Sequence, residues 1–314
     1  MPETSLQHAR GRVRATSTRE GDTEWLCAQA ASGYANYDPA TGRFSLDATQ
    51  AACLADESST SFLAGGMAVV SSMHRDEDTV RAAFRSGEGI GWHEHNHDLF
   101  SGTERFFRPG YTANLLTSWI PAFSGLEQAL QRGITVADVG CGHGASTLIM
   151  AEAFPRSTFV GFDAHPESVV AARSSAEAAG LAGRVAFEVA SAREFPGEGY
   201  GLVCVFDALH DMGDRTAAAV HIRSVLDDDA VVLLVEPAAG DRLEDNLGLV
   251  GRLFYSASTF ICTPVSRDQG GPTAACLGAQ AGEARLRRVL GDAGFASVRR
   301  AAETPFNMVL EVRP

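Results

Sequence analysis

TVADVGCGHG, at residues 135–144, is the stretch that decides the fold. Its first half is an apolar run typical of a β-strand, its second half contains three alternating glycines, and residues 145–153 follow with a helical pattern. Glycine is used where φ must be positive or where a ligand would collide with a Cβ atom. The helix that follows points its N-terminus at the same place. The stretch therefore predicts a strand, a ligand-binding loop and a helix.

A second predicted strand, Phe159-Val-Gly-Phe-Asp163, ends in an acid. In a βαβ unit of the Rossmann type, an acid at this place accepts hydrogen bonds from both hydroxyls of a ribose. Asp138, just before the first glycine, decides between two classes of cofactor. A carboxylate repels a pyrophosphate, but it attracts the ammonium of a methionine moiety, directly or through water. The loop is therefore predicted to bind S-adenosylmethionine (SAM) rather than NAD.

Four further segments extend the pattern: GWHEH at 91–95, GTERFFRPGY at 102–111, DALHDMGD at 207–214 and LGAQAGE at 277–283. With the glycine loop, they resemble the class I SAM-dependent methyltransferases. Within these, the resemblance is to a bacterial, largely actinomycete subfamily with an N-terminal winged-helix domain and a C-terminal Rossmann-like domain. It extends from Trp25 to Pro314. It implies an α/β fold and SAM as cofactor, with S-adenosylhomocysteine (SAH) as product, and it leaves the acceptor open.

Composition and charge limit the partners. The chain has 314 residues, of which 45% are hydrophobic and 21% charged, enough for one large domain and a smaller one. A formal net charge of −13 and a pI near 5.1 predict repulsion from nucleic acid and from anionic membranes, and they favour a small or cationic acceptor. Six cysteines without a C-x-x-C pair, and the lack of an apolar leader or membrane span, predict a cytoplasmic protein with no membrane partner.

Three parts are expected along the chain. Residues 1–57 are predicted to be a basic arm and a partial winged-helix domain, with a helix over 24–32 and a β-hairpin around the turn at 38–42. Residues 58–130 form a helical linker that roofs the active site, and residues 131–314 form the Rossmann-like SAM-binding domain. Members of the family that the chain resembles carry more helical residues before the hairpin. A homodimer or a complex with a small accessory chain is therefore expected to complete this part. Nucleic acid is not expected as a partner.

The Rossmann-like part is expected to contain a mostly parallel seven-stranded sheet that ends in an antiparallel hairpin. The predicted strands are 135–139, 159–163, 185–189, 202–206, 231–236, 298–303 and 308–312. In the linker, the apolar periodicity predicts helices over 61–83 and 106–129, separated by a Gly- and His-rich loop over 87–102.

Ligands of such sheets bind at the carboxyl ends of the strands, where the strand order reverses. The residues predicted to bind the cofactor lie in the glycine loop and at these strand ends: Asp138, Gly140, Cys141, Gly142, Gly144, Asp163, Ala164, Ser191, Ala192, Phe206 and Asp207. Many methyltransferases hold the adenine amino group with an acid where this sequence has Ser191, so its hydroxyl or the backbone is expected to serve instead.

His210 and Asp211 follow the strand predicted over 202–206. In winged-helix O-methyltransferases a His-Asp pair at this strand end deprotonates the acceptor hydroxyl, so the resemblance implies that His210 is the general base. A neutral imidazole can accept a proton at cellular pH. The alternative is a structural His210 that caps the next helix or orders the loop. Glu236, at the end of the fifth strand, either orients His210 as the carboxylate of a dyad or is a structural acid.

The linker supplies the candidate acceptor-binding residues. Trp92, His93 and His95 are expected to face the acceptor, and Arg108 and Tyr111 to position the acceptor or the methionine carboxylate. Alternate histidines without a spaced partner are weak evidence for a metal, and no metal site is predicted.

The sequence thus predicts SAM-dependent methyl transfer to a small molecule, at oxygen and in secondary metabolism. Two alternatives remain open. The fold is compatible with a SAM-linked ring closure such as cyclopropane formation, with SAH as the leaving group. It is also compatible with a SAM-sensing winged-helix regulator.

Overall fold

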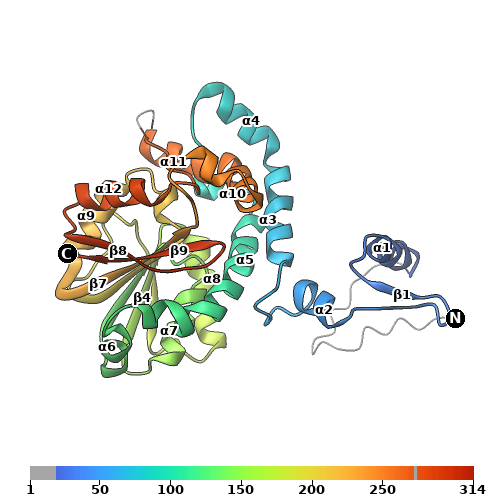
Figure 1. Cartoon of the computed structure of the whole chain (residues 1–314), viewed down its shortest axis with the longest axis horizontal. Coiled ribbons are helices and arrows are strands. Elements are labelled where there is room, and N and C mark those ends of the chain that lie inside the picture. Colours follow the sequence, from blue (N-terminus) through green and yellow to red (C-terminus); the bar gives the residue numbers. More distant parts are fainter. Residues whose placement is uncertain (1–18, 272–273) are drawn as a thin grey trace.

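The structure, a computed structural model, describes residues 19–271 and 274–314. Most of the predicted basic arm lies outside the described residues. The centre of the protein is a seven-stranded sheet with the order β5-β4-β3-β6-β7-β9-β8 (Figure 1). Its strands are β3 (Thr135–Val139), β4 (Thr158–Asp163), β5 (Val185–Val189), β6 (Tyr200–Phe206), β7 (Leu226–Pro237), β8 (Ser297–Glu303) and β9 (Asn307–Arg313).

The strand directions confirm the predicted sheet. The strands from β5 to β7 pair in parallel, and β9 runs antiparallel between β7 and β8. Central strands such as β6 are continuously apolar because helices cover both faces of the sheet. The strand β7 begins earlier than expected, at Leu226, because Leu226 still pairs with Tyr200 although the acids at 227–229 are exposed.

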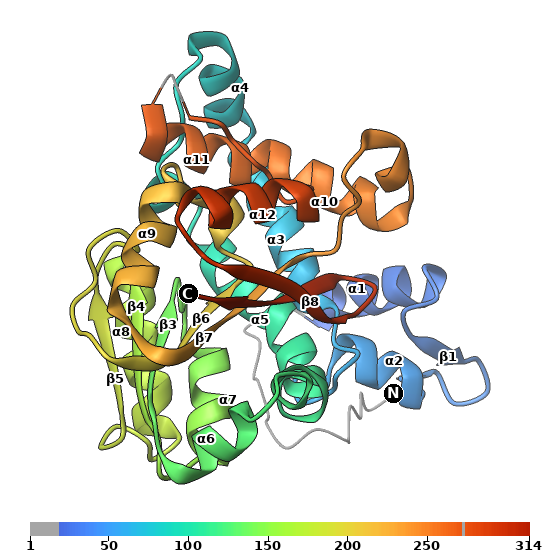
Figure 2. The same ribbon diagram turned by 60° about the vertical axis from the view of Figure 1, so that its left-hand side comes forward.

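Helices bury the two faces of the sheet. On one face pack α6 (Leu126–Arg132), α7 (Ala145–Ala153) and α8 (Pro166–Ala178). On the other face pack α9 (Arg215–Val225) and α12 (Glu283–Asp292). Figure 2 shows these layers with the β8–β9 hairpin crossing the front of the sheet. The two cores hold the strand ends in fixed positions.

The strand order reverses between β3 and β6. The chain continues from β3 to β4 on one side of this point and from β6 to β7 on the other. The segments that follow β3 and β6 therefore diverge and leave a crevice at the carboxyl edge of the sheet. The glycine loop borders it on one side, and a 3-10 turn, η4 (Leu209–Asp211), on the other.

The first half of the linker differs from the prediction. Two helices, α3 (Ala64–Arg75) and α4 (Glu77–Ser86), replace the single helix expected over 61–83, because the helical conformation is interrupted at Asp76. The expected loop over 87–102 is also wrong in part. It contains a 3-10 turn, η1 (Trp92–Glu94), and α5 (Asp98–Asn114) already starts inside it, because Leu99 and Phe100 are buried.

The second half of the linker is not one continuous helix to residue 129. After α5 come a π turn, η2 (Leu115–Trp119), a 3-10 turn, η3 (Ile120–Ala122), and then α6. Pro121 stands at the start of η3, and Gly125, with a φ of 78°, precedes α6. These two residues end the helical run although Leu115, Trp119 and Ile120 are fully buried.

The N-terminal unit stands apart from the body of the molecule and is joined to α3 by a short connection (Figure 1). It contains α1 (Arg19–Ala31), the hairpin strands β1 (Asn36–Asp38) and β2 (Arg43–Ser45), and α2 (Ala48–Leu54). The hairpin is confirmed, whereas α1 starts earlier than the expected residue 24. The helix α2, which was not expected, begins with a capping box in which Asp47 and Gln50 bind each other's backbone N–H groups.

Two helices that the sequence analysis did not predict pack near the linker, and the second of them contributes to the wall of the crevice. They are α10 (Leu249–Phe260), preceded by the 3-10 turn η5 (Leu243–Asn246), and α11 (Cys262–Gly270). Both lie near α3 and α4 in Figures 1 and 2, so segments far apart in the sequence pack side by side.

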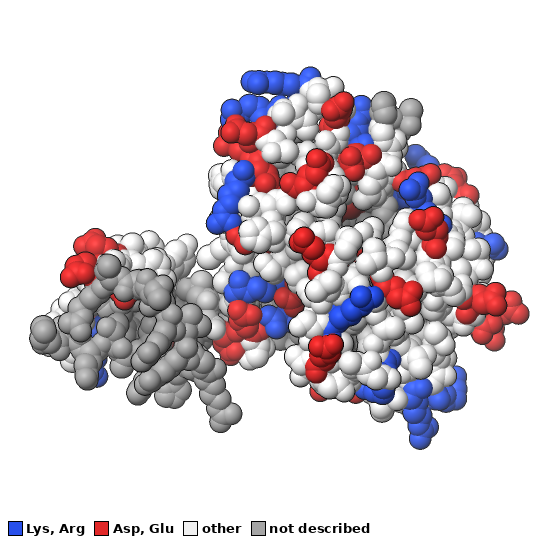
Figure 3. Space-filling model, turned by 180° about the vertical axis from the view of Figure 1, so that it is seen from behind, with Lys and Arg blue, Asp and Glu red and all other residues white. Residues whose placement is uncertain are grey.

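The surface carries mixed charges. On the face shown in Figure 3, acidic and basic side chains of the described residues are interspersed, and no broad basic surface is visible. No helix among residues 19–271 and 274–314 has both the length and the apolar character that crossing a membrane requires.

Gly161 gives a test of the packing of the sheet. It lies in β4 opposite Phe187 of β5, and a Cβ atom at Gly161 would come within 2.4 Å of Cδ1 of that ring. Gly161→Ala should therefore lower the free energy of unfolding by about 1–3 kcal/mol, the usual cost of overpacking. Urea denaturation checks this against Gly183→Ala, whose added methyl group meets nothing within 4 Å. Equal stabilities of the two variants would contradict the packing argument.

Candidate active site

A cavity of about 500 Å³ opens at the carboxyl edge of the sheet, at the reversal point. Its wall combines the glycine loop, the ends of β4, β5 and β6, the linker segments η1 and α5, and the roof helix α11. Of the residues predicted to bind cofactor or acceptor, the wall includes Trp92, His93, Tyr111, Gly140, Cys141, Gly142, Asp163, Ala164, Ser191, Ala192, Phe206 and Asp207. The size is in the range of small-molecule sites.

The glycine loop turns through positive φ values of 76° at Gly140 and 53° at Gly142. A Cβ atom at Gly142 would meet no protein atom within 4 Å, so that face of the loop is open to a ligand. Gly144, in contrast, does not lie on the cavity wall. A Cβ atom there would come within 2.6 Å of the Phe187 ring, so the expectation that Gly144 contacts the cofactor is replaced by a packing role.

Asp163 ties the glycine loop to β4. Its Oδ2 accepts a hydrogen bond from the Gly142 N–H at 2.9 Å, and its Oδ1 accepts one from the His165 N–H at 2.9 Å. Burial raises the pKa of this carboxyl, against the lowering effect of these two bonds. The side chain lines the cavity, so it is placed where a ribose could bind.

Asp138 lies one layer behind the cavity wall. It is 1% exposed, and its Oδ2 accepts hydrogen bonds from the hydroxyls of Ser146 at 2.7 Å and Thr147 at 2.6 Å. Burial raises its pKa to about 6. The side chain is covered by the loop and by α7 and does not line the cavity, and the predicted contact with SAM, directly or through water, stays a prediction. Its other oxygen, Oδ1, has no hydrogen-bond partner among the described residues.

Asp207 has a strained backbone at the end of β6. It is the one non-glycine residue among those described with a positive φ, 49°, a conformation that costs energy and is concentrated at functional sites. Tyr111 donates a hydrogen bond from its hydroxyl to Oδ2 at 3.1 Å, and Asn307 donates from Nδ2 to Oδ1 at 2.8 Å. Burial, reinforced by Glu236, raises the pKa of Asp207 to about 8. Asn307 is a positioning residue that the sequence analysis missed.

His210 lies between two carboxylates. Its Nδ1 is 2.6 Å from Oε2 of Glu236, and its Nε2 is 3.0 Å from Oδ1 of Asp211. The other oxygen of Glu236 accepts a hydrogen bond from the Leu209 N–H at 2.9 Å, which fixes the carboxylate. Burial alone would lower the pKa of His210, but Asp211 and Glu236 outweigh it and raise the pKa well above the usual value of 6.5.

The cavity wall includes Asp211 but neither His210 nor Glu236. His210 therefore lies behind Asp211 as seen from the cavity, and its role toward the acceptor stays a prediction. Asp211 lies between the cavity and the imidazole. Successive side chains of the 3-10 turn η4 point in different directions, so Asp211 points to the cavity and His210 does not.

Two predicted acceptor-binding residues do not reach the cavity. His95 is 5% exposed and its Nδ1 lies 3.1 Å from Oδ2 of Asp76, so it joins the linker segments together. Arg108 donates to Glu57 at 3.0 Å and lies 3.1 Å from Glu104. Acids outside the cavity bind both side chains, and their predicted contacts with the acceptor stay predictions.

Several wall residues were missed by the sequence analysis. They are mostly aromatic or polar side chains from α5, from the loops after β3 and β4, from the segment between η4 and α9, and from α11: Phe100, Thr103, Glu104, Phe107, His143, His165, Met212, Asp214, Val265, Asp268 and Gln269. For His143 and His165, a position inside the glycine loop or directly after a strand end was a usable signal. The residues on α11 had no such signal.

A family model described as a methyltransferase domain matches residues 130–293, more than half of the chain. The chain belongs to this methyltransferase family. It is a SAM-dependent methyltransferase, and the open glycine loop with Asp163 beside it fits that cofactor. No curated protein matches the methyltransferase in sequence.

Solved structures similar to the methyltransferase include PigF with SAH, an O-methyltransferase family protein from Burkholderia thailandensis and the mitomycin 7-O-methyltransferase MmcR. PigF is 16% identical with a TM-score of 0.70, and the match covers 94% of this chain and 85% of that chain. The Burkholderia protein is 18% identical with a TM-score of 0.67, covering 94% and 84%. MmcR is 17% identical with a TM-score of 0.64, covering 95% and 85%. These likenesses confirm the class I methyltransferase fold.

Asp138 gives a pH-dependent test of the loop. Its pKa is 3.8 when unperturbed and about 6 in the folded protein, so the stability it contributes is present below pH 3.8 and is lost as the pH rises to 6. Asp138→Asn cannot ionise. Between pH 4 and pH 6.5, the free energy of unfolding of the wild type should therefore fall relative to the variant by up to about 3 kcal/mol.

Urea denaturation across this pH range measures the difference. Asp78→Asn, which changes a side chain that is 97% exposed, is the matched control and should run parallel to the wild type. A parallel curve for Asp138→Asn would contradict the raised pKa of Asp138.

Proposed function

We propose that the methyltransferase methylates a hydroxyl oxygen of a small-molecule acceptor in secondary metabolism. The observation that carries this proposal is the chain of contacts from Asp211 on the cavity wall through His210 to Glu236. When bound, SAM supplies a methyl group on a positively charged sulfur. A polar chain of this kind beside the cavity offers an acceptor hydroxyl a place to lose its proton.

The roles of the residues follow from their positions. Methyl transfer is an in-line displacement, and alignment of the reacting atoms contributes up to about 7–11 kcal/mol. Tyr111 and Asn307 hold Asp207 at the reversal point, and the aromatic side chains of Trp92 and Phe107 give the acceptor an apolar wall. The acceptor hydroxyl meets the Asp211 carboxylate first and Nε2 of His210 behind it, so the two side chains act together in taking up the proton.

The family supports methyl transfer, and the solved structures named as O-methyltransferases support oxygen as the atom methylated. The matched family is one of methyltransferases, and MmcR is an O-methyltransferase that acts on mitomycin. The acidic wall residues, such as Glu104, Asp214 and Asp268, also suit an acceptor that is neutral or cationic. Neither SAM-linked ring closure nor SAM sensing has a specific observation in its favour.

The N-terminal unit is proposed to be completed by a second copy of the chain or by a small accessory chain. Three large apolar side chains, Trp25, Tyr34 and Tyr37, are 59%, 46% and 52% exposed. Exposed apolar surface of this kind is a common feature of protein interfaces. The proposed domains are residues 1–57, 58–130 and 131–314, with the first a partial winged helix, in a protein of the cytoplasm.

Asp163 is proposed to bind the ribose of the cofactor. Asp163→Ala should weaken the binding of SAM and of SAH to the same extent, because both carry the same ribose. Two lost hydrogen bonds to a carboxylate cost roughly 1.5–3 kcal/mol each. Isothermal titration calorimetry with both ligands makes the comparison. Unchanged affinity, or a loss confined to SAM, would remove Asp163 from the ribose site.

His210 is proposed to act on the acceptor and not on the cofactor. His210→Ala should leave SAM affinity nearly intact and lower turnover by about 10²–10⁴-fold. The loss should shrink at higher pH if the acceptor is a phenol, which then ionises unaided. The matched control is His97→Ala, since the His97 side chain is 82% exposed and is not on the cavity wall. Wild-type turnover in His210→Ala would refute the role.

A further inference from the structure

The charged residues of the cavity wall are nearly all acidic. Among the described wall residues, Arg193 is the one arginine or lysine, and the acids are Glu104, Asp163, Asp207, Asp211, Asp214 and Asp268. SAM carries a positive charge on its sulfur, whereas the sulfur of SAH is neutral. The two ligands are otherwise alike apart from the methyl group. A carboxylate close to the sulfur would therefore distinguish SAM from SAH.

Three of these acids lie on segments that cover the cavity and not at strand ends. Glu104 belongs to α5 and is paired with Arg108 at 3.1 Å. Asp214 directly precedes α9, and Asp268 belongs to α11. Because the cofactor of such a sheet binds at the carboxyl ends of the strands, these three acids are not placed for its centre.

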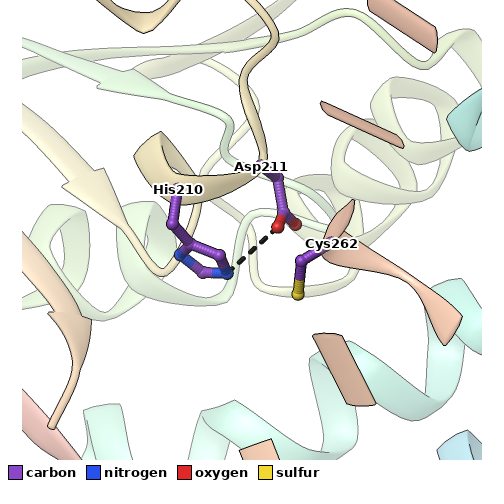
Figure 4. A group of neighbouring side chains, drawn as sticks. All are labelled: His210, Asp211 and Cys262. Atoms are coloured by element: carbon purple, nitrogen blue, oxygen red, sulfur yellow. Dashed lines mark ion pairs between the residues drawn. The ribbon is translucent and has the colours of Figure 1, made fainter. Parts of the chain in front are cut away.

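Two further acids have partners at the two ends of the cofactor site. Asp163, at the end of β4, is the proposed ribose ligand. Oδ1 of Asp211 lies 3.0 Å from Nε2 of His210, and Figure 4 shows these two side chains facing each other beside Cys262. The sulfur of SAM joins the ribose to the methyl group, which must reach an acceptor next to Asp211. The sulfur is therefore expected between Asp163 and Asp211.

Asp207 occupies this intermediate position. It directly follows β6, and the strand order β4-β3-β6 places it across the glycine loop from Asp163. Its backbone N–H donates to the Val235 carbonyl at 2.7 Å, and Tyr111 and Asn307 donate to its two carboxylate oxygens. A carboxylate has roughly four lone-pair sites, so these two side-chain donors fix its orientation without using its full capacity.

Aromatic rings surround Asp207 on the cavity wall. The ring of Tyr111 is stacked with that of Phe107 at a centroid distance of 6.0 Å, and it lies 5.3 Å from the ring of Phe206. All three rings belong to wall residues. Aromatic faces attract cations, and apolar surroundings strengthen an electrostatic interaction. A carboxylate among such rings suits a cation that has no N–H or O–H group to donate, as is the case for a sulfonium.

We propose that the Asp207 carboxylate is the counter-charge for the sulfonium of SAM and makes the site discriminate between SAM and SAH. This inference rests on the proposed ribose site at Asp163, and it deepens the binding of the cofactor by naming what its charge contacts. It does not depend on the acceptor.

The charges around Asp207 add a proton to this binding step. The groups that face its carboxyl are Tyr111 of α5, Glu236 of β7, and His210 and Asp211 of η4. Burial, reinforced by Glu236, raises the pKa of Asp207 to about 8, so its carboxyl is mostly protonated at pH 7. A sulfonium favours the ionised form. Binding of SAM should therefore release the Asp207 proton to the solvent, whereas binding of SAH should leave it in place.

Asp207→Asn tests the counter-charge by isothermal titration calorimetry with SAM and with SAH. Asparagine keeps the shape, can accept from Asn307 and tolerates the positive φ of this position. At pH 8, where about half of the Asp207 carboxyl is ionised, the variant should bind SAM roughly 10–100-fold more weakly and SAH nearly as before. The matched control is Asp214→Asn, which removes another wall carboxylate and should leave the ratio of the two affinities unchanged.

The wild type gives a second test that needs no substitution. Below pH 8 the ionised fraction of Asp207 grows with pH, so the affinity for SAM relative to SAH should rise by up to about tenfold between pH 6 and pH 7. Asp138, with a pKa of about 6, also titrates in this range, but it should affect both ligands alike. In Asp207→Asn the ratio of the two affinities should stay constant across this range.

Equal losses of SAM and SAH affinity in Asp207→Asn, or unchanged affinity for both, overturn the proposal. An equal change of the ratio in Asp214→Asn also overturns it, because general acidity of the cavity would then suffice. If Asp207→Asn does not fold, as judged by circular dichroism, the wild type decides, and a constant ratio between pH 6 and pH 7 refutes the role of Asp207. A wrong ribose site would appear in Asp163→Ala instead, and a wrong acceptor atom in neither measurement.

Discussion

The parallel pairing of β3 with β6 is the constraint on which the rest of the site depends. It sets Asp138 opposite Cys204, so the segments that follow the two strands leave the sheet side by side. The fit is close: a Cβ atom at Gly140 would come within 2.9 Å of the Cβ of Ala208. The glycine loop and the segment with Asp207, His210 and Asp211 are thus held close together. The register of β3 against β6 therefore sets the positions of both the glycine loop and the segment after β6.

Buried carboxylates dominate the electrostatics of this edge. Asp138, Asp163, Asp207 and Glu236 are satisfied mainly by hydroxyl, amide and backbone donors rather than by lysine or arginine. Such burial favours the protonated forms, as the raised pKa values of the first three show. A cationic methyl donor compensates in part for this negative charge. The acidic cavity therefore suits SAM better than a cofactor with a pyrophosphate, which agrees with the argument from the glycine loop.

The sheet and much of the cofactor site could be predicted because their signals are local. An apolar run followed by glycines or an acid marks a strand end, and the parallel topology brings strand ends together. His95 and Arg108 could not be placed in this way, since their positions depend on Asp76 and Glu57, whose proximity only the packing of the linker creates. The same holds for α11. Nothing in the sequence of α11 indicates that Val265 and Asp268 line the cavity at the edge of the sheet.

Glu236 prepares His210 for its proposed part in proton uptake. The carboxylate holds Nδ1 and directs Nε2 toward Asp211, and Glu236 is itself held by the Leu209 N–H. Burial alone would lower the pKa of His210, but Asp211 and Glu236 raise it well above its usual value. A proton that leaves the acceptor is therefore held on the imidazole between two carboxylates rather than returned to the acceptor oxygen.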